Sequence, residues 1–196
     1  MSVLAIVSIK NGAPTKSGLE AASYAADYAA AKGVPSIALV AGEMSGDGSL
    51  GSTGIDKVLH CSEAITDSGQ WAKLTAAAAQ KEGASAVVAS HDHFGRAIAP
   101  RVAVRLQAGL VAGVTELPAN GLVRKNVFSG KAMADVSVNT PTAVYTVTPN
   151  AYGVKDASGD ATVESFTAYI GNVREKVTGF DSASADGQVP LPEAEL

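Results

Sequence analysis

The sequence lacks features that would mark several classes of protein. It contains a single cysteine, Cys61, so it can form neither an internal disulfide framework nor a CxxC site, and a reducing cytoplasm is the simplest compartment for it. No run of about 18 apolar residues occurs, which predicts that no helix spans a membrane. The apolar run at residues 3–9 has no basic region before it, so we expect a first strand there and not a secretory signal.

Basic stripes are also missing. The net charge is −4 and the pI is about 5.3, whereas a nucleic-acid-binding protein usually carries Lys and Arg along one face. The largest basic groups are Arg124 with Lys125 and Arg101 with Arg105, and we interpret both as ordinary solvated surface. Nucleic acid is therefore excluded as an expected partner.

Catalytic motifs are absent as well. The sequence has no GxSxG elbow, no Walker A loop and no HExxH helix, and no spacing ties its serines to its three histidines. We therefore predict no catalytic residue and a protein that is not an enzyme.

Apolar residues, which make up 46% of the chain, are arranged in a pattern that predicts an α/β fold. Strand-like runs at residues 3–9, 36–41, 57–61 and 85–90 alternate with helical patterns at 17–32, 68–82 and 94–108. Ser17 and Glu20 have the spacing of a capping box, and Asp67 can cap the second helix. Such alternation is typical of a three-layer fold, with a parallel sheet between helices on both faces. We expect one domain over residues 1–180 and a linker over 181–196.

The pattern changes after Gly109. Residues 110–117, 121–128, 132–139, 142–148 and 162–170 all have the pattern of extended strands without intervening helices, which predicts additional antiparallel or mixed strands in the C-terminal third. Two interpretations fit their apolar side chains: a surface for a partner, or completion of the domain's own core. The residues concerned are Val111, Val114, Val127, Phe128 and Val136.

Two loops offer candidate ligand sites. Residues 46–51 match GxGxxG, but no crossover helix fits before the next strand and Asp47 would repel phosphate, so we expect a glycine-rich connection that binds no nucleotide. His91, Asp92 and His93 follow a strand at the edge where open α/β sheets bind ligands. A metal shared with His60 and Cys61 is the less favoured reading of this segment. The favoured reading is a polar turn in which Asp92 or His93 caps the next helix.

Arg96 opens the third helix with a long cation. It is suited either to meet an anion or a partner's carboxylate, or to lie on the surface as a plain solvated side chain. It is the one weak candidate for a cofactor-binding residue in this chain.

Several segments resemble the alpha subunits of electron transfer flavoproteins. SHDHFGRAIAPRVAVRL at residues 90–106 is similar to the family segment hsxfGRdllPRvAarL. Residues 54–59 resemble yGadkVl, residues 124–132 resemble RxxyaGka, and residues 141–149 resemble PxvxTvRp. Lys125 and Thr148 depart from the pattern, since they stand where the family commonly has proline and arginine.

The resemblance implies an adenine-nucleotide-hydrolase-like N-terminal domain of an alpha–beta heterodimer. Family members carry electrons from acyl-CoA and related dehydrogenases to a quinone oxidoreductase. They hold FAD mainly on a GRG motif of a later alpha-subunit domain, and the structural AMP belongs to the beta subunit. This chain has no GRG segment. We therefore expect FAD only in the longer protein, and a scaffolding and beta-contacting role here.

Two other classes share the expected fold. One is a stand-alone adenine-nucleotide-binding module of the universal-stress type, which would carry a glycine-rich run before a helix in its C-terminal half; none follows Pro149. The other is a nucleotide-dependent ligase, which would need an SGGxDS-type loop after the first strand. Residues 10–14 do not form one.

Overall fold

Strands and helices alternate as far as Leu106, and strands alone follow. The computed structural model describes residues 1–173 and 177–179, so the predicted domain end near Phe180 and the predicted linker at 181–196 lie outside the described residues. The helices are α1 (Lys16–Lys32), α2 (Ser68–Lys81), α3 (His93–Leu106) and the 3-10 turn η1 (Gly51–Thr53). The strands are β1 (Ser2–Ile6), β2 (Ile9–Lys10), β3 (Ala13–Pro14), β4 (Ser36–Ala41), β5 (Lys57–Cys61), β6 (Ala84–Ser90), β7 (Gly109–Val114), β8 (Leu122–Val127), β9 (Ala132–Ser137), β10 (Ala143–Val147) and β11 (Thr162–Ser165).

The main sheet of the described residues has nine strands, in the order β11-β5-β4-β1-β6-β10-β7-β8-β9. Neighbours from β11 to β7 are all parallel, whereas β8 and β9 are antiparallel to their neighbours. The predicted α/β class with added antiparallel strands is therefore confirmed. One detail is new: β10 is not an addition at the edge but lies inside the sheet, between β6 and β7.

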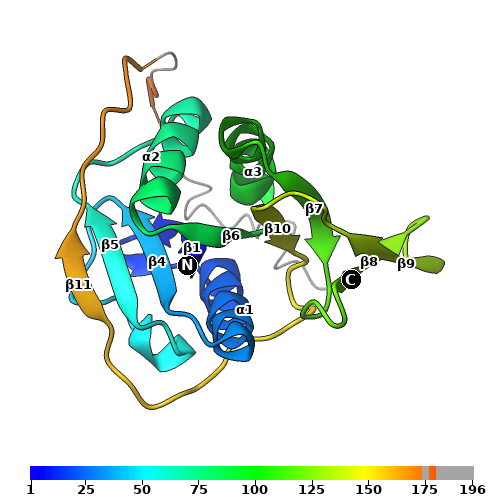
Figure 1. Ribbon diagram of the computed structural model, residues 1–196. Helices are drawn as coiled ribbons and strands as arrows, with labels where there is room; N and C mark the ends of the chain where they lie inside the picture. Colours follow the sequence, from blue (N-terminus) through cyan, green and yellow to red (C-terminus); the bar gives the residue numbers. More distant parts are fainter. Residues whose placement is uncertain (174–176, 180–196) are drawn as a thin grey trace, which may run out of the picture.

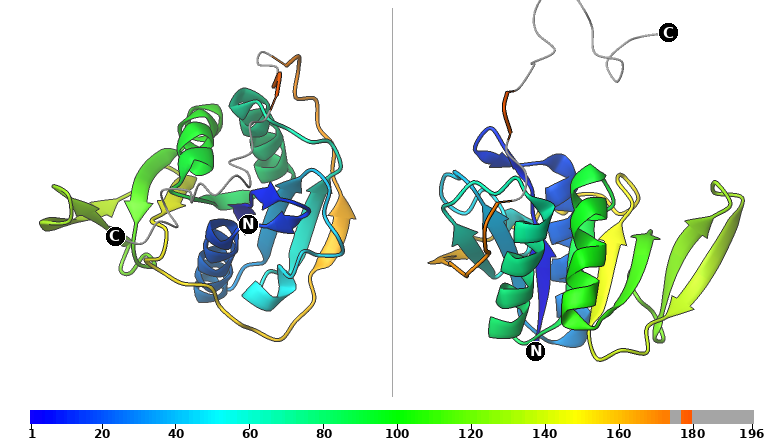
Figure 2. Two further views of the ribbon diagram at one scale, coloured as in Figure 1. Left: turned by 180° about the vertical axis from the view of Figure 1, so that it is seen from behind. Right: turned by 90° about the horizontal axis from the view of Figure 1, so that it is seen from above.

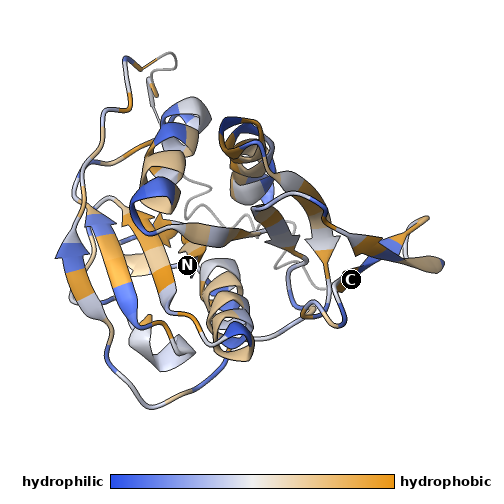
Figure 3. Ribbon diagram, in the orientation of Figure 1, coloured by the Kyte–Doolittle hydropathy of each residue, from blue (hydrophilic) through white to orange (hydrophobic). Residues whose placement is uncertain are grey.

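Helices cover both faces of this sheet, as predicted. Helix α1 lies on one face, and α2 and α3 lie side by side on the other (Figures 1 and 2). Each face has its own hydrophobic cluster: Val3, Ala5 and Val40 point towards α1, while Leu4, Ile6 and Leu39 point towards α2 and α3. The colouring by hydropathy shows this apolar centre in the strands β1, β4 and β5 (Figure 3).

Helix α1 packs closely on the sheet because alanines form most of its buried face. Its start differs from the prediction. Thr15, and not Ser17, is the N-cap, with its hydroxyl accepting the N–H of Gly18 at 3.1 Å. The capping-box reading of Ser17 and Glu20 is therefore wrong, since both side chains are engaged in contacts with distant parts of the chain.

Helix α3 begins at His93, with Asp92 as its N-cap. It runs through Pro100 without ending, so the alternative that the regular helix starts at Pro100 is wrong. Proline lacks the N–H that would bond the carbonyl four residues earlier, which leaves the carbonyl of Arg96 without that partner. The predicted apolar stripe packs into the cluster beneath the helix: Phe94, Ile98, Val102 and Leu106.

The segment between β10 and β11, residues 148–161, crosses the outer side of α1 and reaches the far edge of the sheet (Figure 1). We call it the strap. The carboxylate of Glu20, which is 3% exposed, accepts the backbone N–H groups of Asn150, Tyr152 and Gly153, each at 2.8 Å. The Tyr152 ring packs edge-on against Tyr24, with 5.1 Å between ring centroids. A buried carboxylate on α1 therefore holds the strap in place.

Strands β8 and β9 form a hairpin that projects from the body of the domain (Figures 1 and 2). The apolar residues singled out in β7 and in this hairpin differ in burial. Val111 and Val114 are buried in the α1-side cluster, and Val136 packs against that cluster, so these belong to the core. Phe128, at the tip, is 81% exposed and belongs to no core cluster.

Within the described residues, no helix combines the length and the apolar character that crossing a bilayer would require.

Candidate functional site

The carboxyl edge of the parallel strands gathers the start of α1 and the start of α3, where a chain of hydroxyl groups links the two helices. The hydroxyls of Ser8 and Thr15 lie 2.7 Å apart, and those of Thr15 and Ser17 lie 3.3 Å apart. Ser17 then donates to the Oδ2 atom of Asp92 at 2.8 Å. Residues from the ends of β1 and β6 are thus joined in one polar network at the edge where such folds bind ligands.

Asp92 is the fixed negative charge of this network. Its Oδ1 atom accepts the N–H of Gly95 at 3.0 Å, which completes the cap of α3. Partial burial raises the pKa of Asp92, but hydrogen bonds from Gly95, Ser90 and Ser17 outweigh it, and the pKa is lowered overall. The carboxylate is therefore ionised at neutral pH and oriented by donors from both helices.

His91 faces the neighbouring strand β10. Its Nδ1 atom lies 2.8 Å from the hydroxyl of Thr146, and that hydroxyl also accepts the N–H of Gly113 at 3.0 Å. The backbone N–H of His91 donates to the carbonyl of Val147 at 2.7 Å. A network of side chain and backbone thus fixes the imidazole at the ends of β6, β10 and β7.

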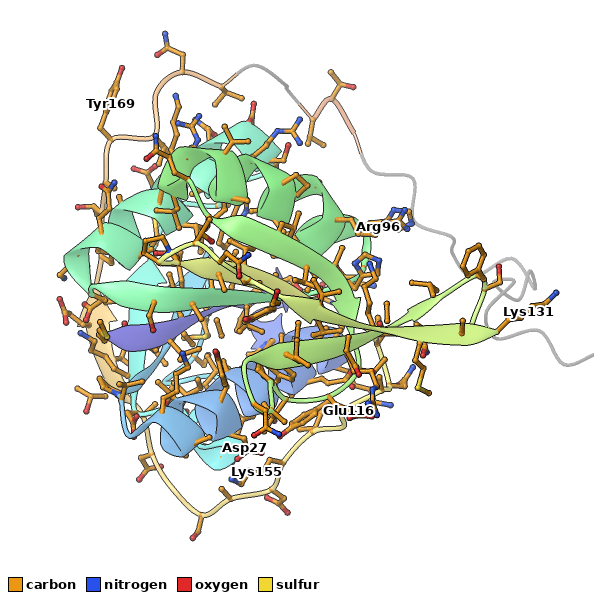
Figure 4. All side chains as sticks on the ribbon, turned by 45° about the vertical axis from the view of Figure 1, so that its right-hand side comes forward. Asp27, Arg96, Glu116, Lys131, Lys155 and Tyr169 are labelled. Atoms are coloured by element: carbon orange, nitrogen blue, oxygen red, sulfur yellow. The ribbon has the colours of Figure 1, made fainter. Side chains whose placement is uncertain are left out.

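Burial and two nearby cations govern the pKa of His91. Burial lowers the pKa of His91, the positive charges of Arg96 and Lys125 lower it further, and Asp92 acts in the opposite direction. The imidazole is therefore neutral at pH 7. Arg96 is exposed, and its side chain extends from the start of α3 away from the body of the domain (Figure 4). Among the residues that the structure describes, neither Arg96 nor Lys125 forms an ion pair.

Gly95 explains why the segment needs a glycine before Arg96. A Cβ atom at this position would lie 1.8 Å from the carbonyl oxygen of Ser90 and 3.3 Å from the Cβ atom of Ala89. Only glycine allows the first turn of α3 to approach the end of β6 this closely. The approach sets the position of Arg96, which follows directly in the same turn.

The structure does not gather the residues of the metal reading. His60 lies on β5, which β4 and β1 separate from β6 in the sheet order, and its Nε2 atom lies 2.8 Å from the carbonyl of Gly42. Cys61 is buried on the α2 side. His93 is exposed at the start of α3. Within the described part of the chain, no group of three or more His, Cys, Asp and Glu side chains comes together as a metal site would require.

The glycine-rich loop at residues 46–51 makes its hydrogen bonds and close contacts with other parts of the same chain. The carboxylate of Asp47 accepts the N–H groups of Ser49, Gly51 and, from the strap, Ala161. A Cβ atom on Gly51 would lie 2.5 Å from both the carbonyl of Gly159 and the N atom of Ala161. Close packing against the strap therefore accounts for a glycine in this motif without a phosphate ligand.

The charge on Asp92 predicts a pH-dependent contribution to stability. Because its folded pKa lies below its unfolded value of about 3.9, the stabilisation is present above that value and lost as the pH falls through the lowered folded pKa.

We expect Asp92→Asn to lower the free energy of unfolding by about 1 kcal/mol at pH 7. Denaturant unfolding from pH 7 to pH 2 should show the two proteins converging at low pH. The same substitution at the exposed Asp156 should change little, and a difference that persisted unchanged at pH 2 would contradict the assignment.

Sequence reasoning found part of this site and missed the rest. It placed the cap of α3 at Asp92 or His93, and the cap is Asp92; it also marked Arg96, which lies in the first turn of that helix. It missed Thr15, Ser17 and Thr146, because a hydroxyl's partner from another strand leaves no periodic signal. The available signal was positional: each of them lies at or just beyond the carboxyl end of a parallel strand or at the start of a helix.

These features define a class. The chain is an α/β domain with a mostly parallel sheet, helices on both faces, a polar network at the carboxyl edge and a projecting antiparallel hairpin. Residues 3–170 match the family model described as the electron transfer flavoprotein domain, and the chain belongs to that family. It is an N-terminal domain of the alpha-subunit type. It is 28% identical over 122 residues to the electron transfer flavoprotein subunit alpha of Bacillus subtilis; the match covers 60% of this chain and 37% of that relative's length.

Proposed function

We propose that this chain is the N-terminal part of an electron transfer flavoprotein alpha subunit and works as a scaffold that binds a beta subunit. In that role the complete complex carries electrons from acyl-CoA and related dehydrogenases to a quinone oxidoreductase, with FAD as its cofactor, in the cytoplasm. The chain itself is a carrier subunit and performs no catalysis. The observation that carries the proposal is the segment at residues 90–106, which holds Asp92, Gly95 and Arg96 in the positions described above.

The tip of the β8–β9 hairpin is the part of the described surface best suited to contact a beta subunit. Phe128 is 81% exposed and Met133, across the hairpin, is 67% exposed. Phe128 also has a φ of 51°, in the left-handed region that side chains other than Gly, Asn and Asp rarely adopt. An exposed aromatic ring in an unfavourable backbone conformation contributes nothing to this domain's core, which favours a role in binding.

The hairpin also carries basic residues. Lys131 is exposed beside Phe128, and Figure 4 shows its side chain at the far end of the hairpin. At the base of the hairpin, Arg124 pairs with Asp135, with 2.8 Å between Nε and Oδ1, so its charge is satisfied within the domain. The surface we assign to the beta subunit is therefore an aromatic and aliphatic tip beside Lys131, which forms no ion pair within the described residues, and its expected partner surface is apolar with acidic groups at the rim.

Phe128→Asp tests this assignment. Because Asp tolerates the left-handed conformation better than Phe, the variant should unfold at the same denaturant concentration as the parent or slightly above it. It should bind the beta subunit at least about 10-fold more weakly, since an exposed aromatic anchor is replaced by a desolvated charge. Co-purification and calorimetry with a co-expressed beta subunit measure both quantities.

The matched control is Tyr169→Asp, which removes a 90% exposed aromatic ring at a position away from the hairpin (Figure 4). That variant should bind beta like the parent. If Phe128→Asp binds beta normally, the hairpin tip is not the contact. If it unfolds, the exposed position assigned to Phe128 is contradicted.

The cofactor gives an independent prediction. A protein tunes a flavin through charges and hydrogen bonds near the ring, and the family resemblance assigns those groups to a later domain and to the partner. The chain alone is therefore expected to emerge from gel filtration free of FAD after incubation with an excess, with no visible absorbance. Retention of one FAD per chain would contradict this, and Arg96→Gln would then show whether the candidate cation takes part.

A further inference from the structure

A β-bulge at the carboxyl end of β7 lies beside His91. The register between β10 and β7 shifts by one residue after Thr146, which leaves Gly113 as an extra residue of β7. A Cβ atom on Gly113 would lie 3.5 Å from the hydroxyl oxygen of Thr148 and 3.7 Å from the Nε2 atom of His91. Glycine at this position therefore leaves both polar atoms uncovered. Bulges often occur beside binding sites, where they direct a side chain towards a ligand.

The neutral imidazole of His91 presents a hydrogen-bond donor at this position. The hydroxyl of Thr146 is buried, accepts the N–H of Gly113 and lies 2.8 Å from Nδ1 of His91, the one acceptor it has in the described part of the chain. Because a buried hydroxyl needs an acceptor for its own proton, Thr146 donates to Nδ1. The proton of the neutral ring is then on Nε2, which has no hydrogen-bond partner among the described residues.

Two cations from other elements lie close to this donor. Arg96 is in the first turn of α3. Lys125 of β8 pairs with Val114, and the carbonyl of Val114 accepts the N–H of Thr148 at 2.9 Å. The charges of Arg96 and Lys125 both lower the pKa of His91, which places them within electrostatic reach of its ring. Within residues 1–173 and 177–179, neither cation forms an ion pair, and the hydroxyl of Thr148 likewise has no hydrogen-bond partner.

The acidic group that acts on His91 is engaged with other partners. The Oδ1 atom of Asp92 accepts the N–H of Gly95, and its Oδ2 atom accepts the hydroxyl of Ser17. Its carboxylate is thus held between the starts of α1 and α3 and forms no ion pair with either cation. Four donors therefore lack an acceptor among the described residues, and we call them the four-donor cluster: Nε2 of His91, the hydroxyl of Thr148, the guanidinium of Arg96 and the ammonium of Lys125.

A phosphate group matches the four-donor cluster better than a carboxylate does. It carries a charge of about −1.5 to −2 near pH 7 and three strong acceptor oxygens, so it can meet two cations and two neutral donors together. A carboxylate has a single charge and only two oxygens, which lie in one plane. We propose that the four-donor cluster, at the carboxyl ends of β6 and β10, binds a phosphate group, with Arg96 and Lys125 as its counter-charges and the two neutral donors orienting its oxygens.

Titration of the chain alone with sodium phosphate tests the proposal, with imidazole and amide resonances followed by NMR at pH 7 and constant ionic strength. The resonances of His91 and Arg96 should shift and saturate in the millimolar range, because exposed charges hold the ligand. The pKa of His91 should rise, since a bound dianion offsets the two cations that lower it. Sodium chloride at the same ionic strength should do neither. No beta subunit is present, so the result does not depend on the proposed scaffold function.

Matched charge variants separate this site from a general attraction of anions. Arg96→Gln with Lys125→Gln should weaken phosphate binding at least about 10-fold, because two charge-assisted contacts are lost. Arg101→Gln with Lys131→Gln removes the same two charges at exposed positions outside the cluster and should leave binding unchanged. Thr148→Val removes one hydroxyl at nearly constant volume and should weaken binding about 5-fold.

Three results would overturn the proposal. The first is a chloride titration that reproduces the phosphate shifts at equal ionic strength. The second is phosphate binding that survives Arg96→Gln with Lys125→Gln. The third is acetate that binds the cluster as tightly as phosphate, because the ligand would then be a carboxylate. Glycerol phosphate distinguishes two sources of the same group: tighter binding than that of inorganic phosphate identifies a phosphate monoester as the ligand, and weaker binding identifies the free ion.

Discussion

Glu20→Ala is expected to lower the free energy of unfolding by about 3 kcal/mol, although alanine is the better helix former. The substitution removes the acceptor for three backbone N–H groups of the strap, those of Asn150, Tyr152 and Gly153. Water can satisfy some of them only if the strap moves away from α1. Glu20→Gln should lose less, about 2 kcal/mol: its amide oxygen can replace Oε1 towards Tyr152 and Gly153, but its amide nitrogen would face the N–H of Asn150.

Denaturant unfolding gives the global effect, and hydrogen exchange shows whether it is local. The amides of Asn150, Tyr152 and Gly153 should lose protection first in both variants. Glu43→Ala, at an exposed carboxylate with no hydrogen-bonded partner in the described residues, is the matched control and should change stability by less than about 0.5 kcal/mol. If Glu20→Ala unfolds like the parent, or if the strap amides keep their protection, the strap is held by the tyrosine contacts and not by the carboxylate.

Glu20 also shows where sequence reasoning ends. Its spacing from Ser17 suggested a capping box, because local pairs are the ones that a sequence pattern reveals. In the structure, the carboxylate of Glu20 accepts hydrogen bonds from backbone groups 130 or more residues away, and the hydroxyl of Ser17 donates one to Asp92, 75 residues away. Thr15 is the N-cap instead, because its position one residue before the helix allows its hydroxyl to accept the N–H of Gly18. Long-range partners of this kind follow from the packing of the strap, which has no periodicity.

The fold was predictable because it depends on periodic patterns. Continuous apolar runs gave the buried parallel strands, and the four-residue stripe from Phe94 to Leu106 gave α3. The place of β10 inside the sheet was not predictable, because its sequence is as extended and apolar as that of its neighbours and sheet order is fixed by tertiary pairing. The cap of α3 was narrowed to Asp92 or His93 for the same reason that the helices were predictable: its signal is local.

Gly95→Ala is expected to have the second large effect. The added Cβ atom would lie 1.8 Å from the carbonyl oxygen of Ser90, a distance that the backbone can relieve only by moving the start of α3 away from β6. Helix propensity alone favours alanine over glycine by about 1 kcal/mol, so propensity and steric contact predict opposite signs. We expect the steric contact to outweigh the gain in helix propensity, so that the free energy of unfolding falls by about 3 kcal/mol.

The displacement of the start of α3 should also change the surroundings of His91. Moving the first turn of α3 shifts Arg96 relative to His91, so the imidazole resonances of His91 should change in Gly95→Ala even where the protein remains folded. Gly179→Ala is the control, because a Cβ atom there meets nothing within 4 Å and the backbone needs no positive φ. That variant should match the parent in denaturant unfolding. If Gly95→Ala is as stable as the parent or more stable, helix propensity has prevailed, and the close approach of α3 to β6 is not what requires glycine before Arg96.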